Sequence, residues 1–111
     1  MKISKETQER IQELQVLEQN VQSLLMQKQA FQLELSETES AIEEVSKSEG
    51  EMYKIVGQVM IKSDKLEIEK ELKEKKDILS LRVSSFDKQE SSFRERLEKL
   101  REEVTKEIQK N

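Results

Sequence analysis

The chain has 111 residues, of which 40% are charged, 33% apolar and 4% aromatic, and it contains two glycines and no proline. So few apolar residues argue against a compact globular core, whereas this composition is typical of long helices and coiled coils. No stretch approaches the roughly 20 apolar residues of a membrane span and the first ten residues lack the apolar run of a secretion signal, so we predict a soluble, cytoplasmic protein with no membrane partner.

The residue types that most often carry catalysis and metal binding are missing. The chain has no histidine and no cysteine, which removes the usual general base, the thiol nucleophile and the usual zinc ligands. The formal net charge is −4, and lysines and glutamates are interleaved without a basic block, so nothing favours phosphate contacts. We therefore predict no enzyme, no catalytic residues, no cofactor, no metal and no nucleic-acid partner.

Residues of about 3–47 are predicted to form the first long helix, because apolar side chains recur every three or four positions. The heptad a positions are Thr7, Leu14, Val21, Lys28, Leu35 and Ile42, and the d positions are Ile3, Arg10, Leu17, Leu24, Phe31, Thr38 and Val45. Nine of these thirteen residues are apolar, which indicates a coiled-coil seam that needs a partner helix. Gly50 follows where the period is lost, and it suits a helix stop.

Residues of about 52–62 break the helical pattern and are predicted to form a β-hairpin, because β-branched and aromatic residues alternate along them. We place Gly57 in a three-residue turn, and a turn of odd length puts Tyr53, Ile55, Val59 and Ile61 on one face. An isolated two-stranded hairpin is marginal in water and has unpaired edges. We therefore favour assembly with other subunits over simple capping of the helices. The assembly surface is assigned to Tyr53, Ile55, Val56, Gly57, Val59, Met60 and Ile61.

Residues of about 64–109 are predicted to form the second long helix. Asp64 and Glu67 have the spacing of a capping box, with Asp in the place of Ser or Thr. The seam positions that follow repeat every seven residues, with a partial companion row: Leu72, Leu79, Phe86, Phe93 and Leu100, then Val83, Leu97 and Val104. Folding the chain back at the hairpin gives each helix the other as its partner, in a register that pairs Leu14 with Leu100.

The same register places Lys28 and Glu90 in adjacent layers of an otherwise apolar stretch. A buried polar pair there would fix the register at some expense of stability. The alternative is that both side chains reach solvent, and the sequence favours neither. The predicted fold is mainly α, a long antiparallel two-helix coiled coil with a central β-hairpin.

The hairpin segment carries a resemblance to a known family. It runs Met52-Tyr53-Lys54-Ile55-Val56-Gly57-Gln58-Val59-Met60-Ile61-Lys62, followed by Ser63-Asp64-Lys65, and the second helix adds Leu79-Ser80-Leu81-Arg82 and Lys88-Gln89-Glu90. In these segments the chain resembles the beta class of prefoldin subunits, most closely the archaeal form. Met52 departs from the family's more usual Val, a mild change on a strand. The resemblance covers essentially the whole chain and implies a single prefoldin-like domain over residues 1–111.

The family resemblance implies a function as well as a fold. It implies a heterohexamer of two alpha and four beta subunits, in which the hairpins join intersubunit β-barrels and the coiled coils project from them. It further implies a chaperone that binds unfolded proteins without ATP and delivers them to a group II chaperonin.

The seam is predicted to weaken toward the chain ends, because Thr7, Arg10 and Glu107 occupy seam positions there. We expect the two helices to pair poorly in these turns and to leave a set of apolar side chains with incomplete partners: Ile3, Ile11, Leu100, Val104 and Ile108. Such groups on charged helices suit weak binding of many unfolded chains. The alternative is that the ends only fray and bind nothing.

Two other functions remain open at this point. One is a passive coiled-coil scaffold or tether that binds no client and has no effect on the aggregation of another protein. The other is a helical arm that grips RNA, which the acidic charge balance disfavours.

Overall fold

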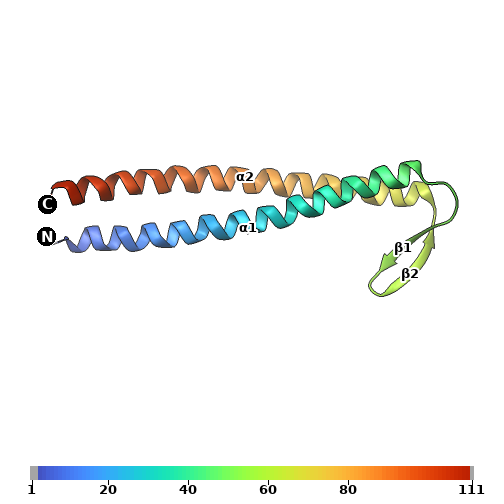
Figure 1. The fold of residues 1–111 in the computed structure, drawn as a ribbon, viewed down its shortest axis with the longest axis horizontal. Helices are drawn as coiled ribbons and strands as arrows, with labels where there is room; N and C mark the ends of the chain where they lie inside the picture. The colour runs from blue at the N-terminus through green and yellow to red at the C-terminus, as the bar shows by residue number, and fades with distance from the viewer. Residues whose placement is uncertain (1–2, 111) are drawn as a thin grey trace. The chain divides into compact units, whose positions relative to one another are not determined.

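The computed structural model describes residues 3–110, and residues 1, 2 and 111 of the predicted domain lie outside that range. The elements in chain order are α1 (Lys5–Lys47), β1 (Met52–Val56), β2 (Val59–Ser63) and α2 (Lys65–Lys110). The predicted mainly helical fold is confirmed, with two long helices and an antiparallel two-stranded hairpin between them in the chain (Figure 1).

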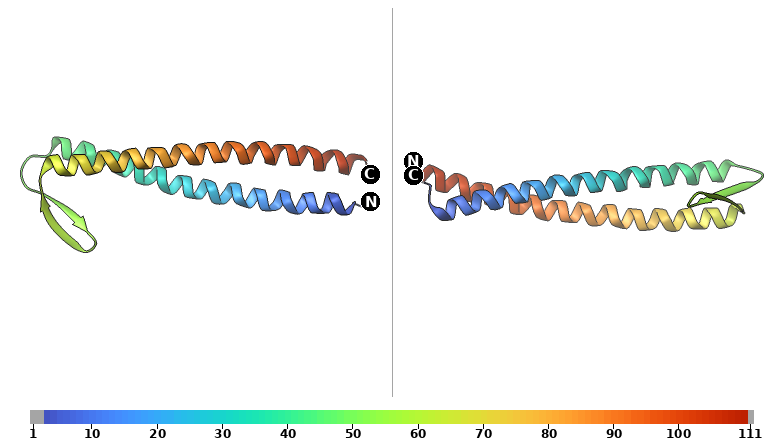
Figure 2. Two further views of the ribbon diagram at one scale, coloured as in Figure 1. Left: turned by 180° about the vertical axis from the view of Figure 1, so that it is seen from behind. Right: turned by 90° about the horizontal axis from the view of Figure 1, so that it is seen from below.

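The chain divides into two compact units. The terminal unit combines the chain up to Gln29 with the chain from Ser84 onward, and the hairpin unit is Ala30–Val83. Within the terminal unit, the first part of α1 lies beside the last part of α2 and runs antiparallel to it (Figure 2). The hairpin unit contains the end of α1, both strands and the start of α2.

The predicted seam forms the core of both units. In α1, every seam position from Thr7 to Val45 is buried or half-buried, and in α2 the same holds for all eight apolar positions predicted. The most deeply buried apolar residues are Leu17, Val21, Leu24, Leu97 and Val104 in the terminal unit, and Ile68 and Leu79 in the hairpin unit. Ile68 was not predicted, because it lies four residues before Leu72 and outside the strict seven-residue spacing.

Side-chain caps set where the helices begin. The hydroxyl of Ser4 accepts a hydrogen bond from the backbone N–H of Thr7 at 3.1 Å, so α1 starts at Lys5. Asp64 accepts one from the N–H of Glu67 at 2.8 Å, which confirms the predicted cap of α2. Lys65 then donates to the carbonyls of Ser46 and Ser48 at 3.0 and 3.3 Å, and a cation there satisfies carbonyl groups that α1 leaves open at its end.

The hairpin turn differs from the prediction by one residue. Val56 pairs directly with Val59, so the loop has two residues, Gly57 and Gln58. Gly57 has a φ of 63°, as the first loop residue of a type II′ turn requires. The prediction of a three-residue turn was wrong because a glycine at this place suits turns of either length.

The shorter turn moves half of the predicted face to the other side of the hairpin. Tyr53 and Ile55 share a face with their partners Lys62 and Met60, and we call this the outer face. The inner face carries Met52, Lys54, Val56, Val59, Ile61 and Ser63. The expectation that Tyr53, Ile55, Val59 and Ile61 lie together was therefore wrong, since one residue of register reverses the direction of every side chain beyond it.

Candidate functional site

Both faces of the hairpin expose apolar side chains. On the outer face, Tyr53, Ile55 and Met60 are 49%, 73% and 66% exposed, and on the inner face Val56, Val59 and Ile61 are 53%, 60% and 44% exposed. Strands with apolar residues on both faces are typical of sheets that are covered on both sides. The six predicted assembly residues with side chains are therefore available to a partner, and Gly57 forms the turn between them.

Lys54 connects the inner face of the hairpin to α2. Its ammonium group lies 3.0 Å from Glu71 and 3.3 Å from Glu67, two carboxylates one helical turn apart. The hydrogen bond to Glu71 and then that to Glu67 raise the pKa of Lys54. Glu67 also accepts a hydrogen bond from the hydroxyl of Ser63 at 2.9 Å, and this bond, followed by that from Lys54, lowers the pKa of Glu67.

The outer face has a different polar contact, which stays within the loop and strands. Lys62 lies 3.2 Å from Glu51, and the hydroxyl of Tyr53 donates to the same carboxylate at 2.8 Å. The hydrogen bond from Tyr53, followed by that from Lys62, lowers the pKa of Glu51. This contact braces the base of the hairpin, and it involves no residue of α2.

The apolar residues predicted to bind clients are less exposed than expected. Val104 is 6% exposed, and Ile11 and Leu100 are half-buried. Ile3 and Ile108 are the accessible ones, at 37% and 36%. The expectation that the helices pair poorly near the chain ends was wrong.

Polar contacts close the seam where apolar residues are missing. Thr7 is 1% exposed, and its hydroxyl donates to Glu107. Arg10 forms an ion pair with the same carboxylate, and Ser4 lies 2.8 Å from the Thr7 hydroxyl. We call Thr7, Arg10 and Glu107 the end clasp. The register that pairs Leu14 with Leu100 also pairs Thr7 with Glu107, so the sequence held a signal for this contact.

A second polar layer crosses the terminal unit at Lys28. Its ammonium group forms ion pairs with Asp87 and, at 3.3 Å, with Glu90. The hydrogen bonds to Asp87 and then Glu90 raise the pKa of Lys28, and the bond from Lys28 is the largest cause of a lowered pKa at Glu90. Lys28 and Glu90 are each half-buried and paired, so of the two alternatives the polar pair is the one observed.

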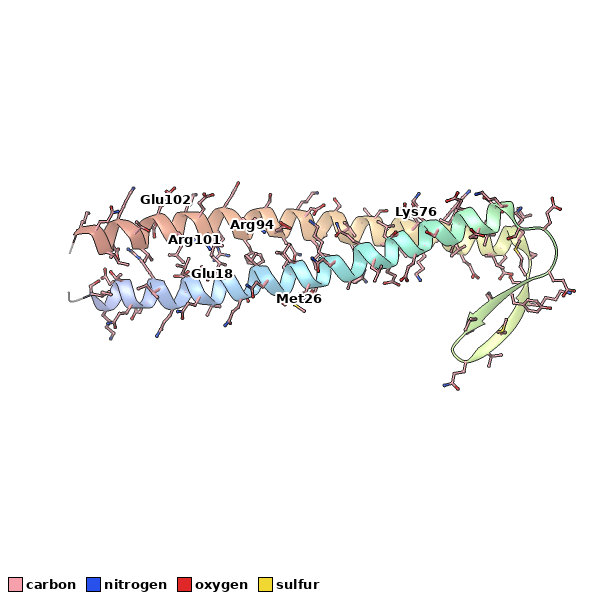
Figure 3. The ribbon with its side chains drawn as sticks, viewed as in Figure 1. Glu18, Met26, Lys76, Arg94, Arg101 and Glu102 are labelled. Atoms are coloured by element: carbon pink, nitrogen blue, oxygen red, sulfur yellow. The ribbon has the colours of Figure 1, made fainter. Side chains whose placement is uncertain are left out.

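Ion pairs between exposed side chains also join the two helices. In the terminal unit, Arg101 of α2 points toward Glu18 of α1, and the two groups lie 3.1 Å apart (Figure 3). In the hairpin unit, Lys75 lies 3.4 Å from Glu34, and Arg82 lies over the ring of Phe31, 5.3 Å from its centroid. These contacts supplement the apolar seam in each unit.

Two further findings concern residues 3–110 alone. Neither helix contains a segment that is both apolar enough and long enough to cross a bilayer. No three acidic, histidine or cysteine residues in this range are grouped so that they could hold a metal ion.

Comparison with known proteins identifies the family. Residues 8–111 match the family described as prefoldin subunit. The chain is 36% identical over 111 residues to prefoldin subunit beta of Saccharolobus islandicus, covering 98% of this chain and 88% of the relative. It is 40% identical over 92 residues to prefoldin subunit beta of Pyrobaculum calidifontis, covering 81% and 74%.

A solved structure agrees with these relatives. The fold is similar to the crystal structure of the prefoldin beta subunit from Thermococcus strain KS-1, with a TM-score of 0.89, 31% identity and coverage of 95% of this chain and 94% of the other. The family match and the curated relatives each extend over most of the sequence. The chain therefore belongs to the prefoldin subunit family.

Proposed function

We propose that this chain is the beta-class subunit of an ATP-independent chaperone of the cytoplasm. It assembles with a prefoldin alpha subunit into a heterohexamer of two alpha and four beta chains, holds unfolded proteins at its helix ends and delivers them to a group II chaperonin. The observation that carries this proposal is the exposed apolar hairpin, whose six large apolar side chains are 44–73% exposed.

The hairpin supports assembly for a simple energetic reason. Its sheet has only two strands, so each strand has one edge without a β-ladder partner in the described chain. Two strands alone are marginally stable in water, and unpaired edges with apolar faces recruit further strands. Strands from other prefoldin subunits complete the sheet and cover these side chains.

The helix ends support client binding in two stages. Ile3 and Ile108 are already accessible and make the first contacts with an unfolded chain. Ile11, Leu100 and Val104 become accessible when the end clasp opens. In the clasp Arg10 and Glu107 are 38% and 27% exposed, and their ion pair is weak compared with an apolar seam. Opening also breaks the hydrogen bond from the buried hydroxyl of Thr7 to Glu107.

Client protection by the assembled hexamer tests the proposal. Replacing Ile3 and Ile108 by Ser removes the two accessible residues of the predicted client-binding set. Each side chain is worth roughly 1.5–3 kcal/mol when fully buried against a client. Light scattering of a denatured client, recorded without nucleotide, should show weaker protection. Replacing Val16 and Met26 by Ser is the matched control, because these apolar residues are 56% and 72% exposed on α1 away from the clasp.

Variants of the end clasp separate its role from that of the apolar groups. The double change Thr7→Val with Glu107→Leu makes the contact apolar and should hold the ends closed, which lowers protection. Glu107→Lys places a cation beside Arg10 and should open them, which raises protection. Equal protection by wild type and all variants would mean that clients bind elsewhere, and no protection by the wild-type hexamer would favour the passive scaffold.

A further inference from the structure

The hairpin is held at a particular orientation to α2 by contacts of Lys54. Lys54 lies on the inner face, and Ile61 is its direct partner across the two strands. The contacts of Lys54 with Glu67 and Glu71 therefore turn this face toward α2. Tyr53, Ile55 and Met60 lie on the opposite face of the hairpin, where they are 49%, 73% and 66% exposed.

The contact is built from groups that are themselves held in place. Glu67 is in the first turn of α2, where Asp64 caps its backbone N–H at 2.8 Å and Ser63 donates to its carboxylate at 2.9 Å. Glu71 lies one turn further along the same side of the helix. Lys54 thus binds two carboxylates on a rigid element, and its own side chain is only 29% exposed.

Lys62 provides a natural comparison on the same hairpin. It is the direct partner of Tyr53 on the outer face, and its ammonium group lies 3.2 Å from Glu51 in the loop. Its side chain is 67% exposed. A lysine on the outer face therefore braces the hairpin locally, whereas Lys54 is bound to the helix.

We infer that Lys54 is a positioning residue that holds the hairpin at one orientation to α2 and so presents Tyr53, Ile55 and Met60 to the strands of other prefoldin subunits. The inference rests on the proposed assembly of this chain with an alpha subunit. A fixed orientation favours assembly because the entropy of ordering the hairpin is already lost before a partner binds.

Spin labels test the orientation directly, since the chain has no cysteine of its own. Gln58→Cys at the turn and Asp77→Cys on α2 give one distance within the hairpin unit. The distribution should be narrow in the wild-type background and in Lys54→Arg, and broad in Lys54→Met with helix content unchanged. Lys62→Met is the matched control and should leave the distribution narrow. An unchanged distribution in Lys54→Met would overturn the inference.

Association with an archaeal prefoldin alpha subunit, followed by size exclusion, tests the consequence. Lys54→Met should weaken association by roughly three- to tenfold, as the loss of two partly exposed ion pairs suggests, and Lys54→Arg should restore it. A broad distance distribution with undiminished association would overturn the link to assembly. If the wild-type chain fails to associate, the proposed function is wrong, and the distance measurement still decides the orientation.

Discussion

In the terminal unit, Leu17, Val21 and Leu97 are at most 7% exposed, whereas in the hairpin unit Ile55, Val59 and Met60 are at least 60% exposed. Both units contain the same two helices and the same kind of seam. The units differ in the polar contacts that lie beside their apolar side chains. In the terminal unit the end clasp joins the helices beside buried apolar residues. In the hairpin unit Lys54 is bound to α2, and Ile55 and Met60 on the opposite face are exposed. This difference fits the proposed conditional binding of clients in one unit and the proposed permanent assembly in the other.

Charge separates the two units as well. The residues up to 29 and from 84 onward hold eleven acidic and eleven basic residues, and residues 30–83 hold thirteen acidic and nine basic ones, which together make the 24 and 20 of the whole chain. The entire net charge of −4 therefore belongs to the hairpin unit. A neutral terminal unit with interleaved signs suits clients of either charge, because no long-range field rejects one sign.

The largest expected effect concerns the exposed hairpin. Ile55→Lys puts a charge on the outer face, and burying it unpaired in an assembled sheet costs several kcal/mol. The double variant with Ile61→Lys does the same on both faces. Neither should form a complex with an alpha subunit on size exclusion. Gln58→Lys, which adds the same charge at the turn, should assemble normally, and a complex of normal size from the Ile55 variant would contradict the assembly role.

The next effect contrasts a covered leucine with an exposed one. Leu97→Ala removes a side chain from the terminal unit's core and should lower the free energy of unfolding by about 2–4 kcal/mol. Leu81→Ala, at a residue that is 72% exposed, should change it by less than about 0.5 kcal/mol. Thermal unfolding followed by circular dichroism measures both, and similar losses would show that the seam is not what stabilises the fold.

The smallest effect is a pH dependence at Lys28. The pKa of Glu90 is lowered below its usual 4.5. The ionised Glu90 carboxylate therefore contributes its full stabilisation above pH 4.5, and this stabilisation is lost as the pH falls through the lowered pKa. The pKa of Lys28 is raised above 10.5, so its contribution is complete below 10.5 and is lost at higher pH. Lys28→Met should therefore lose less stability than wild type between pH 7 and pH 3 in urea unfolding. Equal losses would show that the layer adds no stability.

The sequence predicted regular features well and tertiary contacts less well. The heptad spacing located both helices, and the Asp64 cap fixed the start of α2 to within one residue. The hairpin was placed correctly, but its register was not, because both faces carry apolar residues and neither marks the inside.

The polar contacts were missed for a related reason. Thr7, Arg10 and Glu107 interrupt an apolar pattern, so they indicated a weak seam when each was considered on its own helix. Only the contact between helices shows that they satisfy one another. Lys54 likewise lies on a strand. Its contacts with Glu67 and Glu71 depend on the orientation of the hairpin to α2, which the sequence pattern does not give.

Hydrogen–deuterium exchange tests the division between the units most directly. The chain would be measured alone, with an alpha subunit, and with an alpha subunit and a denatured client. We predict that the alpha subunit protects residues 52–63 and leaves the peptides around the end clasp unchanged, and that the client then protects residues 3–14 and 97–110. Protection of the helix ends by the alpha subunit, or of the hairpin only by the client, would contradict the account.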